Sequence, residues 1–155
     1  MKASIFTLVT ALLISVGGFS QVNFTGYLVD NDDSKLKDVT VNLYKGNEKV
    51  SSKKWSKKFE YDLELESYYT LELVKPQFTV KRIAISTFEG DKSAEPFMFV
   101  MEMIPTEYTN PYTDSDYPSA LIQYKKDEGS FNFDVQYAKN VKKQEKEAKK
   151  KKAKN

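Results

Sequence analysis

Strict alternation between apolar and acidic residues over positions 59–66 constrains the fold of this chain more than any other feature. Because successive side chains of a strand point to opposite faces, one face of this segment is buried and the other meets water. Antiparallel sheets typically show this pattern. The acidic row indicates a solvated outer face rather than the facing carboxylates of a glycosidase. The apolar residues are Phe59, Tyr61, Leu63 and Leu65, and the acidic residues are Glu60, Asp62, Glu64 and Glu66.

The same period of two recurs on both sides of this segment, over residues 22–28, 39–43 and 69–73. Turn-forming residues separate the runs at 30–34 and 45–48. We expect a further strand over 78–87, and we expect the nearly continuous apolar run 97–104 to be the most buried strand. Six or seven regularly spaced short strands without a helical period predict an all-β fold, a two-sheet sandwich that occupies residues 21–104.

Residues 105–138 differ in composition from the predicted sandwich. Proline alternates with tyrosine and aspartate over 105–118, which predicts a long surface loop. A further strand pair is expected over 119–124 and 131–135. From about Asp134 the sequence favours a helix, with Phe133, Tyr137 and Val141 spaced four apart as a short docking stripe.

Charge is distributed unevenly along the chain. Residues 139–155 carry nine Lys and two Glu, a net charge of +7, whereas residues 21–138 have a net charge of −6. We expect 139–155 to be a basic tail, helical or disordered, that contacts an anionic surface such as lipid headgroups or lipopolysaccharide. The tail contains lysine without arginine, and it leaves an acidic body, so specific nucleic-acid recognition is not expected.

The first twenty residues have the features of a secretory signal peptide. Lys2 provides a positive start, the run from Ile5 to Val16 is apolar, and small residues precede a cleavage site between Ser20 and Gln21. A run this short favours a cleaved signal over a membrane anchor. We therefore expect an exported protein without a transmembrane segment after cleavage.

The chain contains neither cysteine nor histidine. Export permits disulfides, but this domain has no residues to form them. The absence of both residue types excludes a Ser-His-Asp triad, a Cys-His nucleophile and a histidine-built zinc or iron site. The sequence thus predicts a protein that is not an enzyme and needs no cofactor.

Two groups of polar residues are weak candidates for binding sites. Asp30, Asp32 and Asp33 offer carboxylate oxygens that Ca²⁺ prefers, although a solvated turn is the simpler interpretation because the spacing of an EF-hand is missing. In the loop, flat tyrosine rings beside carboxylates resemble a carbohydrate or peptide contact surface, although a loop that merely caps the sandwich is the simpler interpretation. Those residues are Tyr108, Tyr112, Asp114, Asp116 and Tyr117.

Four segments together resemble a known family of exported modules. They are GYLVD at 26–30, VTVNLY at 39–44, FEYDL at 59–63 and YTLEL at 69–73. In order and spacing, these segments resemble the carboxypeptidase regulatory-like domain, a seven-stranded transthyretin-like sandwich. The resemblance implies an accessory module without catalytic residues, which accompanies exported enzymes, receptors and surface proteins.

These observations lead to two hypotheses about function. The first is a non-enzymatic binding or assembly module of the cell envelope, in the periplasm or at the surface of a Gram-negative bacterium. Such a module would scaffold a surface or outer-membrane complex through an envelope protein partner. The alternative is a carbohydrate-binding protein that uses Tyr108, Tyr112 and Tyr117 of the loop.

Overall fold

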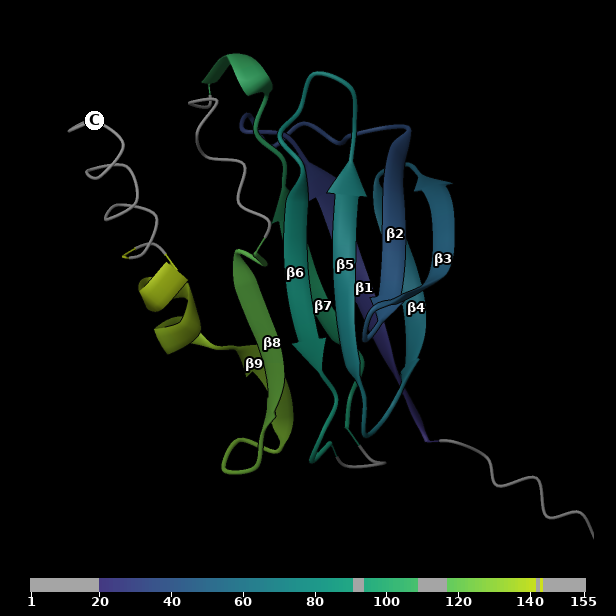
Figure 1. Cartoon of the computed structure of the whole chain (residues 1–155), viewed down its shortest axis with the longest axis vertical. Coiled ribbons are helices and arrows are strands. Elements are labelled where there is room, and N and C mark those ends of the chain that lie inside the picture. The colour runs from purple at the N-terminus through teal and green to yellow at the C-terminus, as the bar shows by residue number, and fades with distance from the viewer. Residues whose placement is uncertain (1–19, 91–93, 109–116, 142, 144–155) are drawn as a thin grey trace, which may run out of the picture.

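Nine strands in two facing sheets make up most of the chain that the computed structural model describes, which is residues 20–90, 94–108, 117–141 and 143 (Figure 1). The predicted signal peptide, apart from Ser20, lies outside the described residues, as does almost all of the basic tail beyond Val141. The strands are β1 (Gln21–Val29), β2 (Val39–Lys45), β3 (Glu48–Trp55), β4 (Lys58–Glu64), β5 (Tyr68–Val74), β6 (Lys81–Ser86), β7 (Phe97–Glu102), β8 (Ala120–Lys125) and β9 (Ser130–Phe133).

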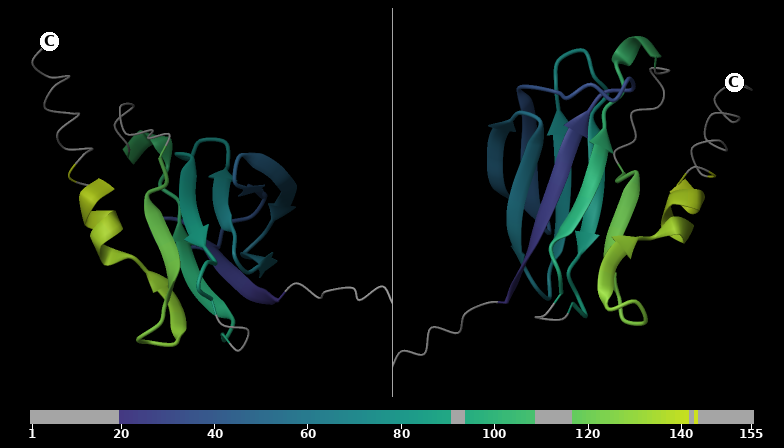
Figure 2. Two further views of the ribbon diagram at one scale, coloured as in Figure 1. Left: turned by 60° about the horizontal axis from the view of Figure 1, so that its bottom comes forward. Right: turned by 180° about the vertical axis from the view of Figure 1, so that it is seen from behind.

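The two sheets differ in width. One has three strands in the order β4-β1-β7, and the other has six in the order β3-β2-β5-β6-β8-β9. Seen from behind, the three-stranded sheet lies in front of the six-stranded one (Figure 2). Most neighbours are antiparallel, but β1 pairs with β7, and β6 with β8, in parallel. The second parallel pair arises because the chain crosses to the other sheet for β7 and then returns beside β6.

The all-β sandwich-like architecture agrees with the sequence prediction. Seven of the nine strands in the described residues, β1–β7, lie within residues 21–104, but they do not make up the whole of the two sheets, so a seven-stranded sandwich is not confirmed. The other two, β8 and β9, lie where a further strand pair was expected, and this hairpin extends the larger sheet beyond β6. This hairpin belongs to the core because Ile122 and Phe131 are both buried.

The prediction that residues 97–104 form the most buried strand is wrong. β7 ends at Glu102, and buried and exposed residues alternate along it. Phe99 and Met101 face the core, whereas Met98 and Val100 face solvent. The physical reason is position: β7 is the edge strand of a sheet that has only one covered face. The apolar run at 97–104 therefore contributes side chains both to the buried inner face and to the exposed outer face of the smaller sheet.

The two sheets pack through apolar side chains of alternating strand positions, as the pattern at 59–63 predicts. Phe59 and Leu63 are buried, and Tyr61 is partly buried against the same core. Gly26 lies opposite Phe59 in the β1–β4 register. A Cβ atom at Gly26 would lie 2.2 Å from the Phe59 Cζ atom. The absence of a side chain at Gly26 is therefore what allows the Phe59 ring to lie against β1.

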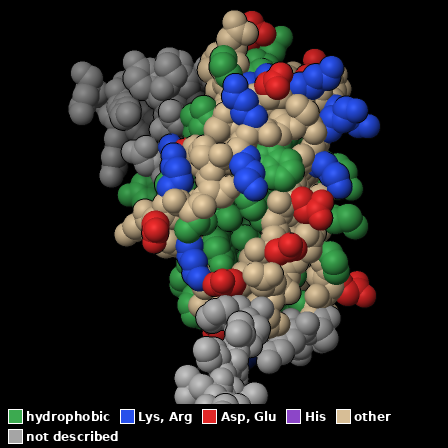
Figure 3. Space-filling view, turned by 90° about the vertical axis from the view of Figure 1, so that its right-hand side faces the viewer, with side chains coloured by type: hydrophobic (Ala, Val, Ile, Leu, Met, Phe, Trp, Pro, Cys, Tyr) green, Lys and Arg blue, Asp and Glu red, His purple; other side chains and the backbone are tan. Residues whose placement is uncertain are grey.

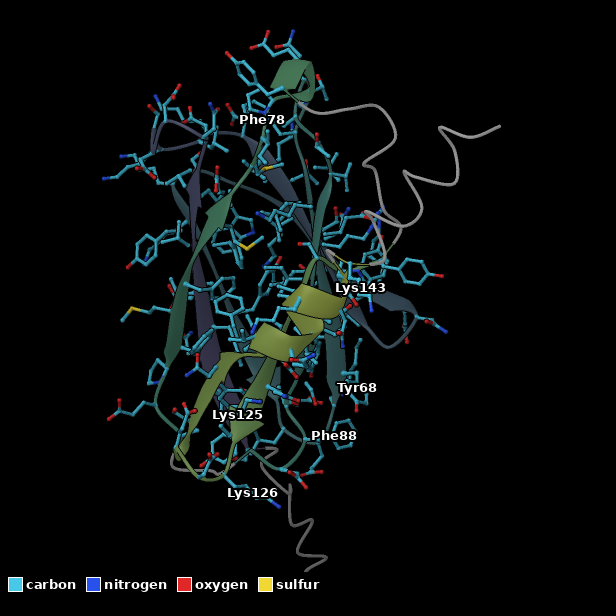
Figure 4. The ribbon with its side chains drawn as sticks, turned by 90° about the vertical axis from the view of Figure 1, so that its left-hand side faces the viewer. Tyr68, Phe78, Phe88, Lys125, Lys126 and Lys143 are labelled. Carbon is cyan, nitrogen blue, oxygen red and sulfur yellow. The ribbon has the colours of Figure 1, made fainter. Side chains whose placement is uncertain are left out.

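A short helix begins directly after β9 and lies against the β8–β9 end of the larger sheet (Figure 4). Its first turn is capped by Asp134, whose Oδ1 atom accepts the backbone N–H of Gln136 at 2.9 Å and of Tyr137 at 3.0 Å. The Tyr137 hydroxyl donates to the Pro118 carbonyl at 3.0 Å. Phe133, the first member of the predicted docking stripe, is in β9 rather than in the helix.

The Gly26–Phe59 contact yields a prediction about stability. Gly26→Ala should destabilise the fold by about 1–3 kcal/mol, because its methyl group overlaps a buried ring in a close-packed core. Chemical denaturation of Gly26→Ala, Phe59→Leu and the double variant measures this. The double variant should be more stable than the sum of the single effects implies, since a smaller side chain makes room for the methyl group. Strictly additive effects would show that the contact does not constrain β1.

Candidate binding surface

The acidic turn proposed for Ca²⁺ is organised by its own backbone. The Asp30 Oδ1 atom accepts the N–H of Asp32 at 2.9 Å and of Ser34 at 2.8 Å, which is an Asx-type turn. Asp33 has a positive φ of 59°, a conformation that aspartate tolerates in turns. Within the described residues, no group of three or more Asp, Glu, Cys or His side chains is arranged to hold a metal. The geometry therefore favours the turn interpretation.

The tyrosine-rich loop is only partly visible in the structure. Tyr108 ends a short 3-10 helix, η1 (Thr106–Tyr108), and 69% of its surface is exposed. Tyr117 is 75% exposed. The other three predicted members, Tyr112, Asp114 and Asp116, lie outside the described residues.

The structure reveals an apolar surface that the sequence interpretation missed. Met98 and Val100 of β7 are 65% and 62% exposed, and Tyr27 of β1 is 42% exposed. Tyr27 pairs with Val100 in the β1–β7 register, and the neighbouring Thr25 pairs with Met98, so the three side chains share the outer face of the smaller sheet. We call Tyr27, Met98 and Val100 the β7 surface. Large apolar side chains gathered at one place on a surface commonly mark a site of interaction.

The strands at the sheet edges differ in charge. At the β3 and β4 edges, blue and red side chains lie along the surface (Figure 3). Charged side chains on an edge strand discourage pairing with another chain. β7 has no charged residue from Phe97 to Met101, and within the described residues β1 is its only strand partner. The charged residues of β3 and β4 are Glu48, Lys49, Lys53, Lys54, Lys58, Glu60, Asp62 and Glu64.

The partly buried Lys81 contacts the C-terminal end of β7. The Lys81 Nζ atom, on β6, donates to the backbone carbonyl of Glu102 at 2.6 Å. Burial lowers the pKa of Lys81, although the nearby Glu102 carboxylate acts in the opposite direction. This contact joins the two sheets at the end of β7 and limits the movement of that strand against the core.

The outer face of the larger sheet carries a polar cluster instead of an apolar surface. The Glu72 carboxylate accepts hydrogen bonds from Asn42 Nδ2 at 2.9 Å and from Arg82 Nε at 2.8 Å. Ser52 donates to the other side of Asn42 at 2.7 Å, so the cluster connects β3, β2, β5 and β6. We call Ser52, Asn42, Glu72 and Arg82 the Glu72 cluster. Its hydrogen bonds join neighbouring strands, which indicates a structural role.

Burial of the Glu72 carboxylate raises its pKa, but hydrogen bonds from Asn42 and Arg82 and the positive charge of Arg82 outweigh that effect. The pKa of Glu72 therefore lies below its ordinary value. A carboxylate held ionised in this way is a poor general acid at neutral pH. The cluster is thus better suited to holding the sheet together than to catalysis.

The sequence pattern of β7 does not by itself locate the β7 surface. The apolar run at 97–104 contains both core residues and exposed residues, and the exposed ones occupy alternate positions. A buried central strand and an edge strand with an apolar outer face share this sequence pattern. Only the position of the strand in the sheet distinguishes the two.

The lowered pKa of Glu72 predicts an acid-dependent loss of stability. Because the folded-state pKa is below the unfolded value, this carboxylate contributes stability above about pH 4.5, and the contribution is lost as pH falls through the folded-state pKa. At neutral pH, Glu72→Gln should cost roughly 1–3 kcal/mol, since it weakens charge-assisted hydrogen bonds. The difference from the unmodified protein should shrink with acidification.

Urea denaturation at a series of pH values measures this difference, and Glu48→Gln at the exposed start of β3 is the matched control. A difference between the Glu72→Gln variant and the unmodified protein that stays constant from neutral to strongly acidic pH would contradict the prediction. The control substitution should have little effect at any pH.

Comparisons with known proteins assign no family to this chain. No protein-family model matches it, and no curated protein is significantly similar to it. The geometry of the β7 surface is therefore the observation from which a function can be argued.

Proposed function

We propose that this protein is a non-enzymatic binding and assembly module of a Gram-negative cell envelope, and that the β7 surface contacts a protein partner. The observation that carries the proposal is the exposure of Met98 and Val100 on an edge strand that has no charged residue from Phe97 to Met101. Burying such side chains releases water from apolar surface, and this is the main favourable term in protein association.

The surface is suited to binding because its backbone is already fixed. Phe99 and Met101 alternate with the exposed residues of β7 and are buried in the core. Lys81 holds the end of the strand through the Glu102 carbonyl. A partner would therefore meet side chains whose backbone loses little freedom on binding, which favours affinity.

The finer fold assignment and the cellular location belong to the same proposal. The four segments that resemble a carboxypeptidase regulatory-like domain lie on or at the end of β1, β2, β4 and β5, which supports a transthyretin-like arrangement. The signal-like residues 1–20 support export to the periplasm or cell surface, and the Lys-rich segment 139–155 supports contact with anionic lipids or lipopolysaccharide. In the described residues, no helix has the length and apolarity needed to cross a bilayer.

Site-specific photo-crosslinking in the producing cell tests the proposal. A photoreactive amino acid at Val100 should form a discrete crosslinked product, because this side chain would lie inside the interface. The same amino acid at Lys54, an exposed position on β3, is the control and should form none. Absence of a product at positions 27, 98 and 100 would show that the β7 surface does not bind a protein there.

Carbohydrate binding is the second candidate function, and the exposure of Tyr108 and Tyr117 favours it. Aromatic rings offer flat apolar area for contact with sugar rings. A second exposed aromatic pair, Tyr68 and Phe88, has ring centroids 4.7 Å apart and lies toward the opposite end of the molecule from η1 (Figure 4). This pair provides a matched control.

A glycan array with residues 21–155 distinguishes the two functions. If the loop binds sugar, the combined variant Tyr108→Ala, Tyr112→Ala and Tyr117→Ala should lose binding, whereas Tyr68→Ala with Phe88→Ala should retain it. Binding that survives the loop variant would reject the loop as the site. An array without any bound glycan favours the assembly module.

A further inference from the structure

We infer that Gln21 is the first residue of the exported protein and that its side chain closes onto its own α-amine there, which gives an N-terminal pyroglutamate. The inference rests on the export part of the proposed function and goes beyond it, because it assigns a covalent modification to one residue. It is carried by three observations: β1 begins at Gln21, the side chain of this residue is exposed, and its backbone nitrogen points away from β4.

The expected cleavage site coincides with the start of the folded domain. Small residues precede the bond between Ser20 and Gln21, as a signal peptidase requires, and β1 begins directly after that bond. Val22, the next residue, is already in the core with 3% of its surface exposed. Cleavage after Ser20 removes the carbonyl that accepts the Leu65 N–H at 2.9 Å, but it leaves all of β1 in place.

The register of β1 against β4 sets the direction of the Gln21 backbone nitrogen. In an antiparallel pair, residues that exchange hydrogen bonds alternate with residues that do not. Because the Ser20 carbonyl accepts the Leu65 N–H, the next pair, Gln21 opposite Glu64, is one that exchanges no hydrogen bonds. The Gln21 nitrogen therefore points away from β4, and a ring closed at this atom costs no hydrogen bond between the two strands.

The reaction needs only the atoms of Gln21, whose side chain is exposed. The uncharged α-amine attacks the side-chain carboxamide carbon, Cδ. A bond forms between the α-nitrogen and Cδ, and the bond between Cδ and Nε2 breaks. Nε2 takes a proton from the α-nitrogen and leaves as ammonia, so no oxidant or other reactant is required. The first residue has no preceding carbonyl, and the lactam ring therefore constrains no peptide bond within β1.

Ring closure protects the start of the smaller sheet. An aminopeptidase recognises the α-ammonium of the first residue, and pyroglutamate has none. Without this block, removal of two residues would take Val22 out of the core, and Phe24, which is fully buried, follows two positions later. Chain ends are preferred sites of proteolysis, so a strand that begins at the first residue is vulnerable unless its terminus is blocked.

Mass spectrometry of the N-terminal peptide tests the inference. The full-length chain, including residues 1–20, is expressed in the producing cell, recovered from the cell envelope and digested with trypsin. The first peptide should span residues 21–35, because Lys35 is the first lysine or arginine after Gln21. Its mass should be lower by one ammonia than that of the open glutamine peptide, and Edman degradation of the intact protein should give no sequence.

Two controls accompany this measurement. A synthetic peptide of residues 21–35 with an open glutamine, carried through the same preparation, measures any ring closure caused by handling. The variant Gln21→Ala cannot form the lactam, so Edman degradation should read its sequence from alanine. Incubation with an aminopeptidase should then shorten the Gln21→Ala variant and leave the unmodified protein intact. Equal resistance of the two proteins would overturn the protective role.

The possible outcomes separate this inference from the proposed function. A first peptide that begins with open glutamine, or with any residue other than Gln21, overturns the inference. In that case export still holds if the protein is recovered from the envelope without residues 1–19. A chain that keeps residues 1–20 and stays in the cytoplasm rejects both the inference and the export part of the proposed function. Crosslinking at position 100 tests the β7 surface independently of the N-terminus.

Discussion

The contact between Phe131 and Phe24 is the interaction on which the rest of the structure depends. A three-stranded sheet is too narrow to lie over all of a six-stranded one, so β8 and β9 extend beyond it. The large ring of Phe131 on β9 connects them to the smaller sheet by packing edge-on against Phe24 of β1, with ring centroids 5.0 Å apart. Phe133 extends the contact to Phe97 and Phe99 of β7. The last hairpin thereby closes the open side of the sandwich, and the helix that follows it is fixed in turn.

This way of closing the sandwich decides which residues remain exposed. Aromatic rings from β9 fill the space beside β7, but within the described residues they form no strand pairing with it. In the described residues β7 therefore has β1 as its only strand partner, while its inward side chains belong to the core. Core and surface residues alternate along one short strand, so the position of Met98 and Val100 is as well determined as that of Phe99. The backbone that holds the core residues of β7 thus also fixes the position of its exposed residues.

Local sequence patterns predicted the strands well, because alternation at 59–63 and 69–73 reports directly which side chains face the core. The positions of strands in the sheets could not be predicted in the same way. The composition of the run at 97–104 predicts the most buried strand, because a buried strand and an apolar edge strand have the same composition. The crossings that make β8 parallel to β6 depend on contacts between residues far apart in sequence. The candidate surface was missed for this reason: it is defined by topology and not by a motif.

The outer faces of the two sheets differ in the polarity of the side chains that they expose to water. On the larger sheet, Asn42 and Glu72 are joined by hydrogen bonds to each other and to Ser52 and Arg82, so this face is stable in contact with water. On the smaller sheet, apolar side chains of β1 and β7 meet water without such compensation. Apolar exposure has a free-energy cost that grows with area, about 25 cal/mol for each Å². The domain is therefore directional: contact on the β7 surface gains more free energy than contact on the Glu72 cluster, and an assembly that buried the β7 surface would present the Glu72 cluster outward.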